Sequence, residues 1–463
     1  MGGVSSQRPT VVILGGGPGG YEAALVAVRS GAEVTVVDRD GLGGACVLTD
    51  CVPSKALVST AAFMGGLSTG DTLGVRGADA VGVDLRAVNR RILGLAASQS
   101  DDIHRKLDAE GVRIVTGAAT LLAPDRVRAQ AADGTSEDLD ADVVLVATGA
   151  TPRTMPTAEP DGERILTWQQ VYALTELPQH LVVVGSGVTG AELAHAYLGL
   201  GVPVTLVSSR ERVLPGEDAD AARVIEDVFR RDGMTVLGRS RMAAVERTAD
   251  GVRVTLVDGR TVDGSHALLA VGSVPQTAGL GLAESGVEVT ESGHVVVDGV
   301  SRTSVRGVYA AGDCTGVLPL ASVAAMQGRI AMWHALGDAV TPLRLSRVSA
   351  NIFTSPEIAT VGISQQQLDD GLTEADVDVL PLATNARAKM DSFEDGFVKV
   401  FSRKGSGTVC GGVVVAPRAS ELIYPIALAV QNHLNVDEVA STFTVYPSMS
   451  GSIGEAARRL HHA

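Results

Sequence analysis

Aromatic residues are scarce in this chain, and their scarcity narrows the fold class. Phe, Tyr and Trp make up 3% of the 463 residues, whereas apolar residues together make up 45%. Val, Ala and Leu must therefore fill the cores, which favours parallel sheets covered by helices, because the strands of such sheets appear as continuous apolar runs. The length predicts about three domains.

Positive charge, long apolar runs and cysteine are also in short supply. The net charge of −15 argues against a nucleic-acid partner, because phosphate binding needs clustered cations. No apolar run reaches the roughly 18 residues of a membrane helix, so we expect no integral membrane association. Four cysteines are typical of a cytoplasmic protein, where a close pair is more often catalytic or metal-binding than structural. We assign no metal ligands.

A glycine-rich turn follows the first apolar run. Gly15, Gly17 and Gly20 stand between the strand-like TVVIL and a helix-like segment, and Asp38 ends the next strand. In such a motif the glycines allow a tight turn, close approach to a pyrophosphate and close packing of helix on strand. The helix N-terminus favours the phosphates, and the carboxylate would bind a ribose. We predict a dinucleotide site.

The same unit occurs a second time near residue 185. Its glycines are Gly185, Gly187 and Gly190. Two dinucleotide folds in one chain imply electron transfer between two cofactors. Here the second strand ends at Ser208, followed by Ser209, Arg210 and Arg212. A hydroxyl and guanidinium groups suit a 2′-phosphate, so we expect NADPH to be favoured, with NADH also used. The alternative is that both arginines are solvated loop residues.

After Leu343 the pattern changes. Strand-like and helix-like segments alternate in RVSANIFTSPEIATVGIS, GFVKVFSRKGSGTVCGGVVVA and ELIYPIALAVQNHL. This alternation predicts an α+β domain with an antiparallel sheet.

Six segments together resemble a known family. LGGGPGGYEAA, GGACVLTDCVPSK, ATGATP, GSGVTGAE, YAAGDC and FTSPEIATVG occur in the order found in the flavoprotein disulfide reductases, which include dihydrolipoamide dehydrogenase, glutathione reductase and mercuric reductase. The resemblance covers essentially the whole chain. It implies an α/β protein with two Rossmann-like domains and a C-terminal α+β domain that forms a homodimer. FAD would bind residues 1–155 and 280–342, NAD(P)H residues 156–279, and residues 343–463 would dimerise.

The resemblance also implies a set of cofactor contacts. Asp313 would hold the ribityl chain of FAD, and the helix that starts near Leu320 and Ala321 would point its N-terminus at the flavin N1–O2 edge. The alternative for Asp313 is a simple helix cap. Matching motifs add Gly44, Thr148 and Gly149 to the Gly15, Gly17, Gly20 and Asp38 set, and Gly272 is a further candidate cofactor-binding residue.

Lys55 and Glu192 match a charged pair of the resembling proteins. That pair lies near flavin N5, where it tunes the flavin and helps to admit the nicotinamide. An exposed pair on one helix is excluded, because 137 residues separate the two positions and helical neighbours are three or four apart.

Cys46 and Cys51 are a candidate redox pair. In an ideal helix their Cα atoms would lie about 8–9 Å apart, whereas a disulfide needs less than about 7 Å. They can therefore bridge only if the segment is irregular, which Gly43, Gly44 and Pro53 permit. By resemblance, Cys51 would be the charge-transfer thiol facing the flavin and Cys46 the interchange thiol.

The base for thiol chemistry is missing. The family supplies it from the other subunit as a His-Pro, with a Glu five residues after the His, and this chain has Tyr446 and Gly451 there. Tyrosine, with an ordinary pKa of about 10, is a poor base at neutral pH. Glu455 is out of register, and we expect His461 and His462 to lie in a frayed tail.

We therefore expect an FAD enzyme that passes hydride from NAD(P)H to flavin and on to a quinone, which takes electrons from the flavin without such a base. Loss of the His–Glu pair resembles the quinone-reductase branch of dihydrolipoamide-dehydrogenase-like actinobacterial flavoproteins. Tyr446 would hydrogen-bond a quinone oxygen or fill the vacated space. The alternatives are a disulfide or mercuric reductase using Cys46 and Cys51, and a non-enzymatic flavin redox sensor.

Overall fold

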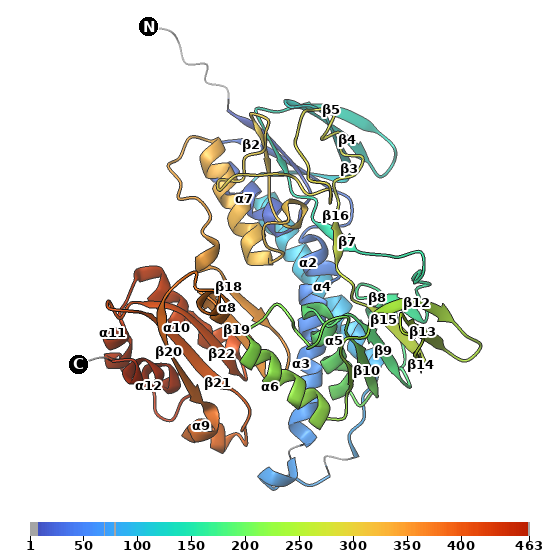
Figure 1. Cartoon of the computed structure of the whole chain (residues 1–463). Helices are drawn as coiled ribbons and strands as arrows, with labels where there is room; N and C mark the ends of the chain where they lie inside the picture. Colours follow the sequence, from blue (N-terminus) through green and yellow to red (C-terminus); the bar gives the residue numbers. More distant parts are fainter. Residues whose placement is uncertain (1–7, 69, 78–79, 462–463) are drawn as a thin grey trace. The chain divides into compact units, whose positions relative to one another are not determined.

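The computed structural model describes residues 8–68, 70–77 and 80–461. It divides into two compact units, and each is built from several stretches of chain. The first unit contains the residues up to Ser54, Arg90–Arg153 and Gly272–Arg344, and the second contains Lys55–Asn89, Thr154–Val271 and Leu345 onward (Figure 1). Helices α3 (Cys51–Ser68) and α4 (Leu85–Ala109) contribute residues to both units.

The first unit is built on a seven-stranded sheet. Its strand order is β17 (Val308–Ala310), β6 (Val143–Val146), β1 (Thr10–Leu14), β2 (Glu33–Asp38), β3 (Arg113–Ala123), β4 (Arg126–Ala131) and β5 (Ser136–Asp140). The strands from β17 to β3 are parallel, whereas β4 and β5 add an antiparallel extension. A two-stranded ribbon joins β7 (Ala150–Pro152) to β16 (Ser273–Pro275). Three of the parallel strands, β1, β6 and β17, are largely apolar runs of the kind that the composition predicts.

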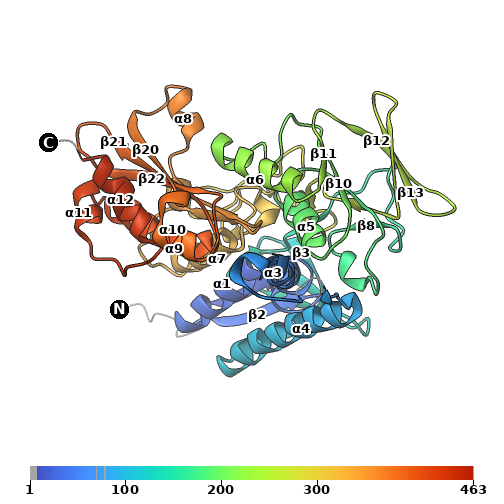
Figure 2. The ribbon, with the colours of Figure 1, turned by 90° about the horizontal axis from the view of Figure 1, so that it is seen from below.

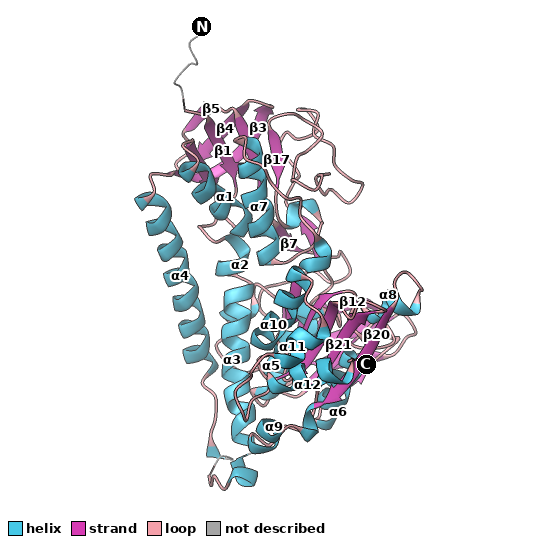
Figure 3. Ribbon diagram, turned by 90° about the vertical axis from the view of Figure 1, so that its left-hand side faces the viewer, coloured by secondary structure: helices cyan, strands magenta, loops and turns pink. Residues whose placement is uncertain are grey.

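Two helices pack side by side on this sheet. They are α1 (Pro18–Arg29) and α7 (Ala321–Ala335), seen in Figure 3. Their approach is close because glycines face each other: a Cβ added at Gly328 would lie 2.0 Å from the carbonyl oxygen of Gly19. The short α2 (Gly44–Leu48) follows β2 and precedes α3.

The second unit contains a five-stranded parallel sheet. Its order is β11 (Thr235–Leu237), β10 (Val204–Val207), β9 (Leu181–Val184), β15 (His266–Leu269) and β8 (Ile165–Thr167). Helix α5 (Val188–Gly199) follows β9, and α6 (Ala219–Arg231) comes between β10 and β11. A three-stranded antiparallel sheet joins β12 (Met242–Arg247), β13 (Val252–Leu256) and β14 (Thr261–Gly264).

The same unit ends in the antiparallel sheet that the sequence predicts. Its order is β18 (Ser349–Ile352), β19 (Glu357–Gly362), β22 (Val409–Ala416), β21 (Phe397–Arg403) and β20 (Ala375–Pro381). Helices α10 (Ala419–Asn432), α11 (Val436–Ser441) and α12 (Gly451–Arg459) cover one face of it, and Figure 2 shows them together. The short α8 (Gln365–Asp369) and α9 (Ala386–Met390) lie in the connections. The predicted mixed α/β fold class is thus confirmed.

A buried lysine ties α6 to the antiparallel sheet. Lys399 in β21 is 1% exposed, and its Nζ lies 2.7 Å from Asp218 Oδ2 and 2.9 Å from Asp220 Oδ2. Asp218 also caps α6, because its Oδ1 accepts the backbone N–H groups of Asp220 and Ala221. A buried charge needs such partners to be tolerated.

Length and apolarity together rule out a membrane crossing for every helix in the described ranges, including the 25-residue α4.

Candidate functional site

The first glycine-rich turn has the geometry of a phosphate-binding turn. Gly15 has a φ of +102°, and a Cβ there would lie 2.4 Å from the carbonyl oxygen of Ala147. A Cβ at Gly20 would lie 1.9 Å from the carbonyl oxygen of Gly15, so both positions require glycine. Gly17 is the N-cap of α1, and a Cβ there would meet no described atom within 4 Å. The helix N-terminus therefore faces open space that fits a phosphate.

Asp38 closes this turn from the end of β2. Its Oδ2 accepts the N–H of Gly16 at 2.6 Å, and its Oδ1 accepts the N–H groups of Asp40 and Gly41 at 3.0 and 2.6 Å. A carboxylate has about four lone-pair positions, so one acceptor position on Oδ2 remains for a ribose hydroxyl. Asp38 thus holds the loop as well as offering a ribose contact.

Parallel pairing gathers further predicted residues at one sheet edge. Gly15, Thr148 and Asp313 each follow the carboxyl end of a strand, in β1, β6 and β17, and these three strands are parallel neighbours. Ligands of open α/β sheets bind outside such ends. The hydroxyl of Thr148 donates to the Gln276 carbonyl at 2.6 Å, and Gly149 turns the chain with a φ of +70°.

At this edge of the sheet, the Asp313 carboxylate is the side chain best placed to bind a ligand hydroxyl. Burial raises its pKa, and the nearby His294 acts in the opposite direction. Among the described residues, no donor hydrogen-bonds to this carboxylate. Buried polar groups are normally paired, so the carboxylate fits a ligand hydroxyl such as that of a ribityl chain. It does not cap α7, since Leu320 is the N-cap of that helix and supplies no side-chain bond, so the first turn starting at Ala321 keeps open N–H groups.

The cysteine segment is irregular, as bridging would require. Cys46 lies in α2 and Cys51 begins α3, and the helical path is interrupted at Thr49 and Asp50, whose N–H groups both donate to the Ala45 carbonyl. Both cysteine side chains are partly buried. Gly44 lets α2 approach the phosphate turn, because a Cβ there would lie 2.9 Å from Gly17 Cα.

The second glycine turn repeats the geometry of the first. A Cβ at Gly185 would lie 2.1 Å from the Ala270 carbonyl oxygen, and one at Gly190 would lie 1.9 Å from the Gly185 oxygen. Gly187 is the N-cap of α5 with open space before it. Gly272, by contrast, belongs to the first unit, where its carbonyl accepts the N–H of Arg153 at 2.9 Å.

The residues after β10 divide into a buried and an exposed group. The Ser208 hydroxyl is fully buried, lies 2.6 Å from the Ser186 hydroxyl and bonds to the backbone of Arg210. It shapes the loop and faces away from solvent, so a ribose phosphate would meet Ser209, Arg210 and Arg212 instead. Within the described chain, neither Arg210 nor Arg212 has a carboxylate partner.

Lys55 and Glu192 lie in contact, as the resemblance implies. Lys55 Nζ is 2.8 Å from Glu192 Oε2, and Glu192 is 2% exposed. The other oxygen, Oε1, accepts the N–H of Phe353 at 2.8 Å. Lys55 Nζ also lies 5.0 Å from the centre of the Phe353 ring, a cation–π distance. The pair is therefore held by contacts within the second unit.

The region that replaces the missing base carries no buried acid or base. Tyr446 is 85% exposed in the single chain, and Gly451 begins α12. Glu455 forms an ion pair with Arg458. The expectation of a frayed His461 is wrong, because its Nδ1 lies 2.6 Å from Asp437 Oδ1. His462 lies outside the described residues.

Comparison with known proteins identifies the family. The family model for pyridine nucleotide-disulphide oxidoreductase matches residues 9–328, and the model for the dimerisation domain of the same family matches residues 348–457. The chain belongs to the pyridine nucleotide-disulphide oxidoreductase family. The predicted family, enzyme class and fold are thereby confirmed, and the family implies FAD and a pyridine nucleotide as cofactors.

Individual members of the family are similar over nearly the whole chain. An NAD(P)H dehydrogenase (quinone) of Mycobacterium tuberculosis is 56% identical over 97% of this chain and 93% of that protein. A dihydrolipoyl dehydrogenase of Chlorobaculum tepidum is 33% identical over 96% of both chains. The crystal structure of LpdA from M. tuberculosis superposes with a TM-score of 0.94 at 55% identity, covering 98% of this chain and 100% of that one.

Several residues that hold these sites have no signature in the sequence. Gln327 is buried, accepts the N–H of Gly312 at 2.9 Å and so fixes the turn before Asp313. Phe353 and His195 hold the surroundings of Glu192. Gln327 and His195 accept backbone N–H groups, and Phe353 donates its own backbone N–H to Glu192. Residue spacing does not reveal such contacts; only the FTSPEIATVG motif marked the Phe353 region.

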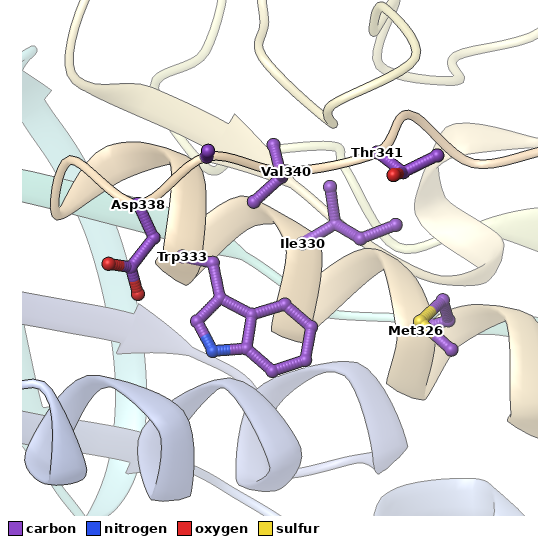
Figure 4. A pocket seen from close by; sticks show the side chains of 7 residues that line it. Met326, Ile330, Trp333, Asp338, Val340 and Thr341 are labelled. Carbon is purple, nitrogen blue, oxygen red and sulfur yellow. The ribbon is translucent and has the colours of Figure 1, made fainter.

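None of the predicted site residues lines the cavity in Figure 4. It has a volume of about 500 Å³ and is lined by α7 and the chain after it, with Met326, Ile330 and Trp333 on one side and Val340 and Thr341 on the other. It is open to solvent and largely apolar. We assign it no part in the cofactor sites.

Proposed function

We propose that this enzyme passes a hydride from NAD(P)H to FAD and two electrons onward to a quinone. One observation carries the proposal: the charged pair Lys55–Glu192 is intact and its carboxylate is buried, whereas Tyr446 and Gly451 occupy the positions of the family's thiol base. The similarity to the M. tuberculosis protein named NAD(P)H dehydrogenase (quinone) supports it. In the balanced reaction, NAD(P)H, one proton and a quinone are converted to NAD(P)⁺ and a hydroquinone.

The chain's own residues bind, orient and tune. FAD, when bound, accepts the hydride and returns electrons to the acceptor. The turns at Gly15–Gly20 and Gly185–Gly190 would hold the two pyrophosphates, and Asp313 would hold the ribityl hydroxyls. Lys55 would place a positive charge beside the flavin ring, where it stabilises negative charge as the flavin is reduced. Glu192 would keep that lysine charged and in place.

The nucleotide preference is proposed to be NADPH over NADH. Support comes from the exposed Arg210 and the partly exposed Arg212, which have no carboxylate partner in the described chain, while the adjacent Arg239 pairs with Glu211. Guanidinium groups bind phosphates by paired, charge-assisted hydrogen bonds.

The assembly is proposed to be a cytoplasmic homodimer with the three-domain division given above. The dimerisation-domain match supports this, as does an exposed apolar segment in which Phe443, Val445 and Tyr446 are 102%, 77% and 85% exposed. Exposed apolar clusters of this kind mark interaction surfaces. Tyr446 would then either donate to a quinone oxygen or fill the interface, and Tyr446→Phe separates the two roles.

Steady-state oxidation of NADPH with different acceptors tests the proposal. Menadione or benzoquinone should support fast turnover, while lipoamide and low-molecular-weight disulfides should give turnover near the background rate. Fast lipoamide turnover with negligible quinone turnover would overturn the proposal.

A disulfide reductase remains the second candidate, because Cys46 and Cys51 are both present on an interrupted helical path that permits bridging. It predicts that an anaerobic NADPH titration takes up four electrons with a long-wavelength charge-transfer band. The quinone proposal needs only the two electrons of the flavin.

A further inference from the structure

Two side chains on one face of α5 hold the short segment 353–355. Glu192 Oε1 accepts the N–H of Phe353 at 2.8 Å, and His195 Nδ1 accepts the N–H of Ser355 at 3.0 Å. Residues three apart on a helix are surface neighbours, so α5 presents two acceptors to donors two residues apart. The segment joins β18 to β19. Its backbone is held at its first residue, Phe353, and at its third, Ser355.

Phe353 links this clamp to the charged pair. Its N–H orients the Glu192 carboxylate, and its ring lies 5.0 Å from Lys55 Nζ. Within the described residues, Glu192 accepts hydrogen bonds from the Phe353 N–H and from Lys55. A shift of Phe353 would therefore disturb both charges at once. The orientation of the pair thus depends on where the 353–355 segment lies.

His195 is built to serve as an acceptor. Because Nδ1 accepts a hydrogen bond, the neutral ring carries its proton on Nε2, which faces Asp232 Oδ2 at 4.0 Å. The ring of Phe229 packs against it at 4.8 Å. Burial lowers the pKa of His195 to about 4, so the ring stays neutral at pH 7. A charged imidazole would donate from both nitrogens and lose the Ser355 contact.

We propose that His195 is a positioning residue for hydride transfer: by holding Ser355 it fixes Phe353, and through Phe353 it fixes the Lys55–Glu192 pair. This inference rests on the proposed function, in which that pair faces the reacting nicotinamide and flavin. His195 is neutral and bonds to the Ser355 backbone, so its loss should change the geometry of the pair without removing a charge.

Three variants of the purified flavoenzyme test this. His195→Leu removes the acceptor at similar volume, and His195→Asn keeps an acceptor oxygen near the Nδ1 position. His266→Leu is a matched control at a half-buried histidine whose ring bonds to the Ser265 hydroxyl. The first readout is amide hydrogen exchange of the peptide with the Phe353, Thr354 and Ser355 amides, which does not depend on turnover. The second is stopped-flow separation of flavin reduction by NADPH from flavin reoxidation by benzoquinone.

His195→Leu should speed exchange of these amides about 3- to 10-fold, the effect of losing one hydrogen bond, and should slow flavin reduction by a similar factor. Reoxidation by benzoquinone should not change, and His195→Asn should restore both affected values. Equal slowing of both half-reactions, no rescue by asparagine, or an unchanged reduction rate would overturn the inference.

A second pair of variants covers a failure of His195→Leu to fold. Ser355→Pro removes the donor without touching α5, and Ser355→Ala, which keeps the N–H, is its comparison. The proline variant should reproduce the selective slowing of flavin reduction. If Lys55→Met leaves flavin reduction unchanged, the part of the proposed function that rests on the Lys55–Glu192 pair fails. If Lys55→Met slows flavin reduction and neither His195→Leu nor Ser355→Pro does, only this inference fails.

Discussion

Glu192 and Tyr446 occupy two positions where the resembling enzymes keep groups essential to turnover, and their surroundings differ sharply. Glu192 is 2% exposed, and both its oxygens are engaged. Tyr446 is 85% exposed in the single chain, next to a segment whose Glu455 pairs with Arg458. Hydride transfer needs a fixed electrostatic environment, whereas thiol exchange needs a proton carrier. Under the proposed function, the chain keeps the first requirement and lacks the second.

The largest effect should come from removing the lysine of the Lys55–Glu192 pair. Lys55→Met should slow flavin reduction by NADPH about 100-fold, the effect of removing one electrostatic group beside reacting atoms. It also leaves Glu192 buried without a counter-charge, which should cost about 3 kcal/mol of unfolding free energy. Stopped-flow absorbance and urea unfolding measure the two effects, and exposed Lys389→Met serves as the control. An unchanged rate of flavin reduction would show that Lys55 has no role in hydride transfer.

The double variant Lys55→Met with Glu192→Gln separates the two effects. It removes both charges, so it should regain most of the lost stability and none of the lost rate. Recovery of the rate would mean that Lys55→Met acts only through misfolding.

The protonation of His195 gives a smaller effect with a defined sign. Its folded pKa is about 4, whereas an unfolded histidine titrates near 6.5. The unfolded chain therefore binds more protons between these values, so the unfolding free energy falls as pH decreases. From pH 7 to pH 5 this amounts to about 2 kcal/mol. Urea unfolding of the wild type and of His195→Asn at both pH values checks this. The variant should lack the part of the decrease in unfolding free energy that comes from His195. The same pH dependence in both would contradict it.

The two dinucleotide folds differ at the end of the second strand, where β2 ends in Asp38 and β10 is followed by Ser208. Substitutions of the arginines after Ser208 should show whether this difference sets the nucleotide preference. Arg210→Ala and Arg212→Ala should each raise KM for NADPH about tenfold, the scale of one charge-assisted phosphate contact, with KM for NADH unchanged. Arg239→Ala is the matched control, because that guanidinium already pairs with Glu211. A parallel rise for both nucleotides would argue against a 2′-phosphate contact.

The sequence was informative where backbone geometry demands a residue type, and less so elsewhere. Gly15, Gly20, Gly185 and Gly190 could be located because only glycine fits beside the carbonyl oxygens they contact. The Lys55–Glu192 contact came only through the resemblance, since nothing local joins residues so far apart. The burial of Ser208 was missed, because its role depends on Ser186 in a neighbouring turn.

The polar supports were beyond prediction for a physical reason. Gln327, His195 and Lys399 act through tertiary partners, two of them backbone N–H groups, and a polar side chain that will be buried looks like any other in the sequence. The cysteine segment shows the opposite case: its glycines and proline indicated an irregular path, and the break at Thr49 and Asp50 agrees.

The central claim is that electrons leave from the flavin and not from the cysteine pair. A variant that should have no effect on flavin reoxidation tests it most directly. Reduced Cys46→Ser enzyme should be mixed with benzoquinone under anaerobic conditions, and flavin reoxidation followed by absorbance, with wild type alongside. We predict equal rates, because the electrons leave from the flavin without sulfur. A loss of reoxidation in the serine variant would contradict the account and assign the electron exit to the cysteine pair.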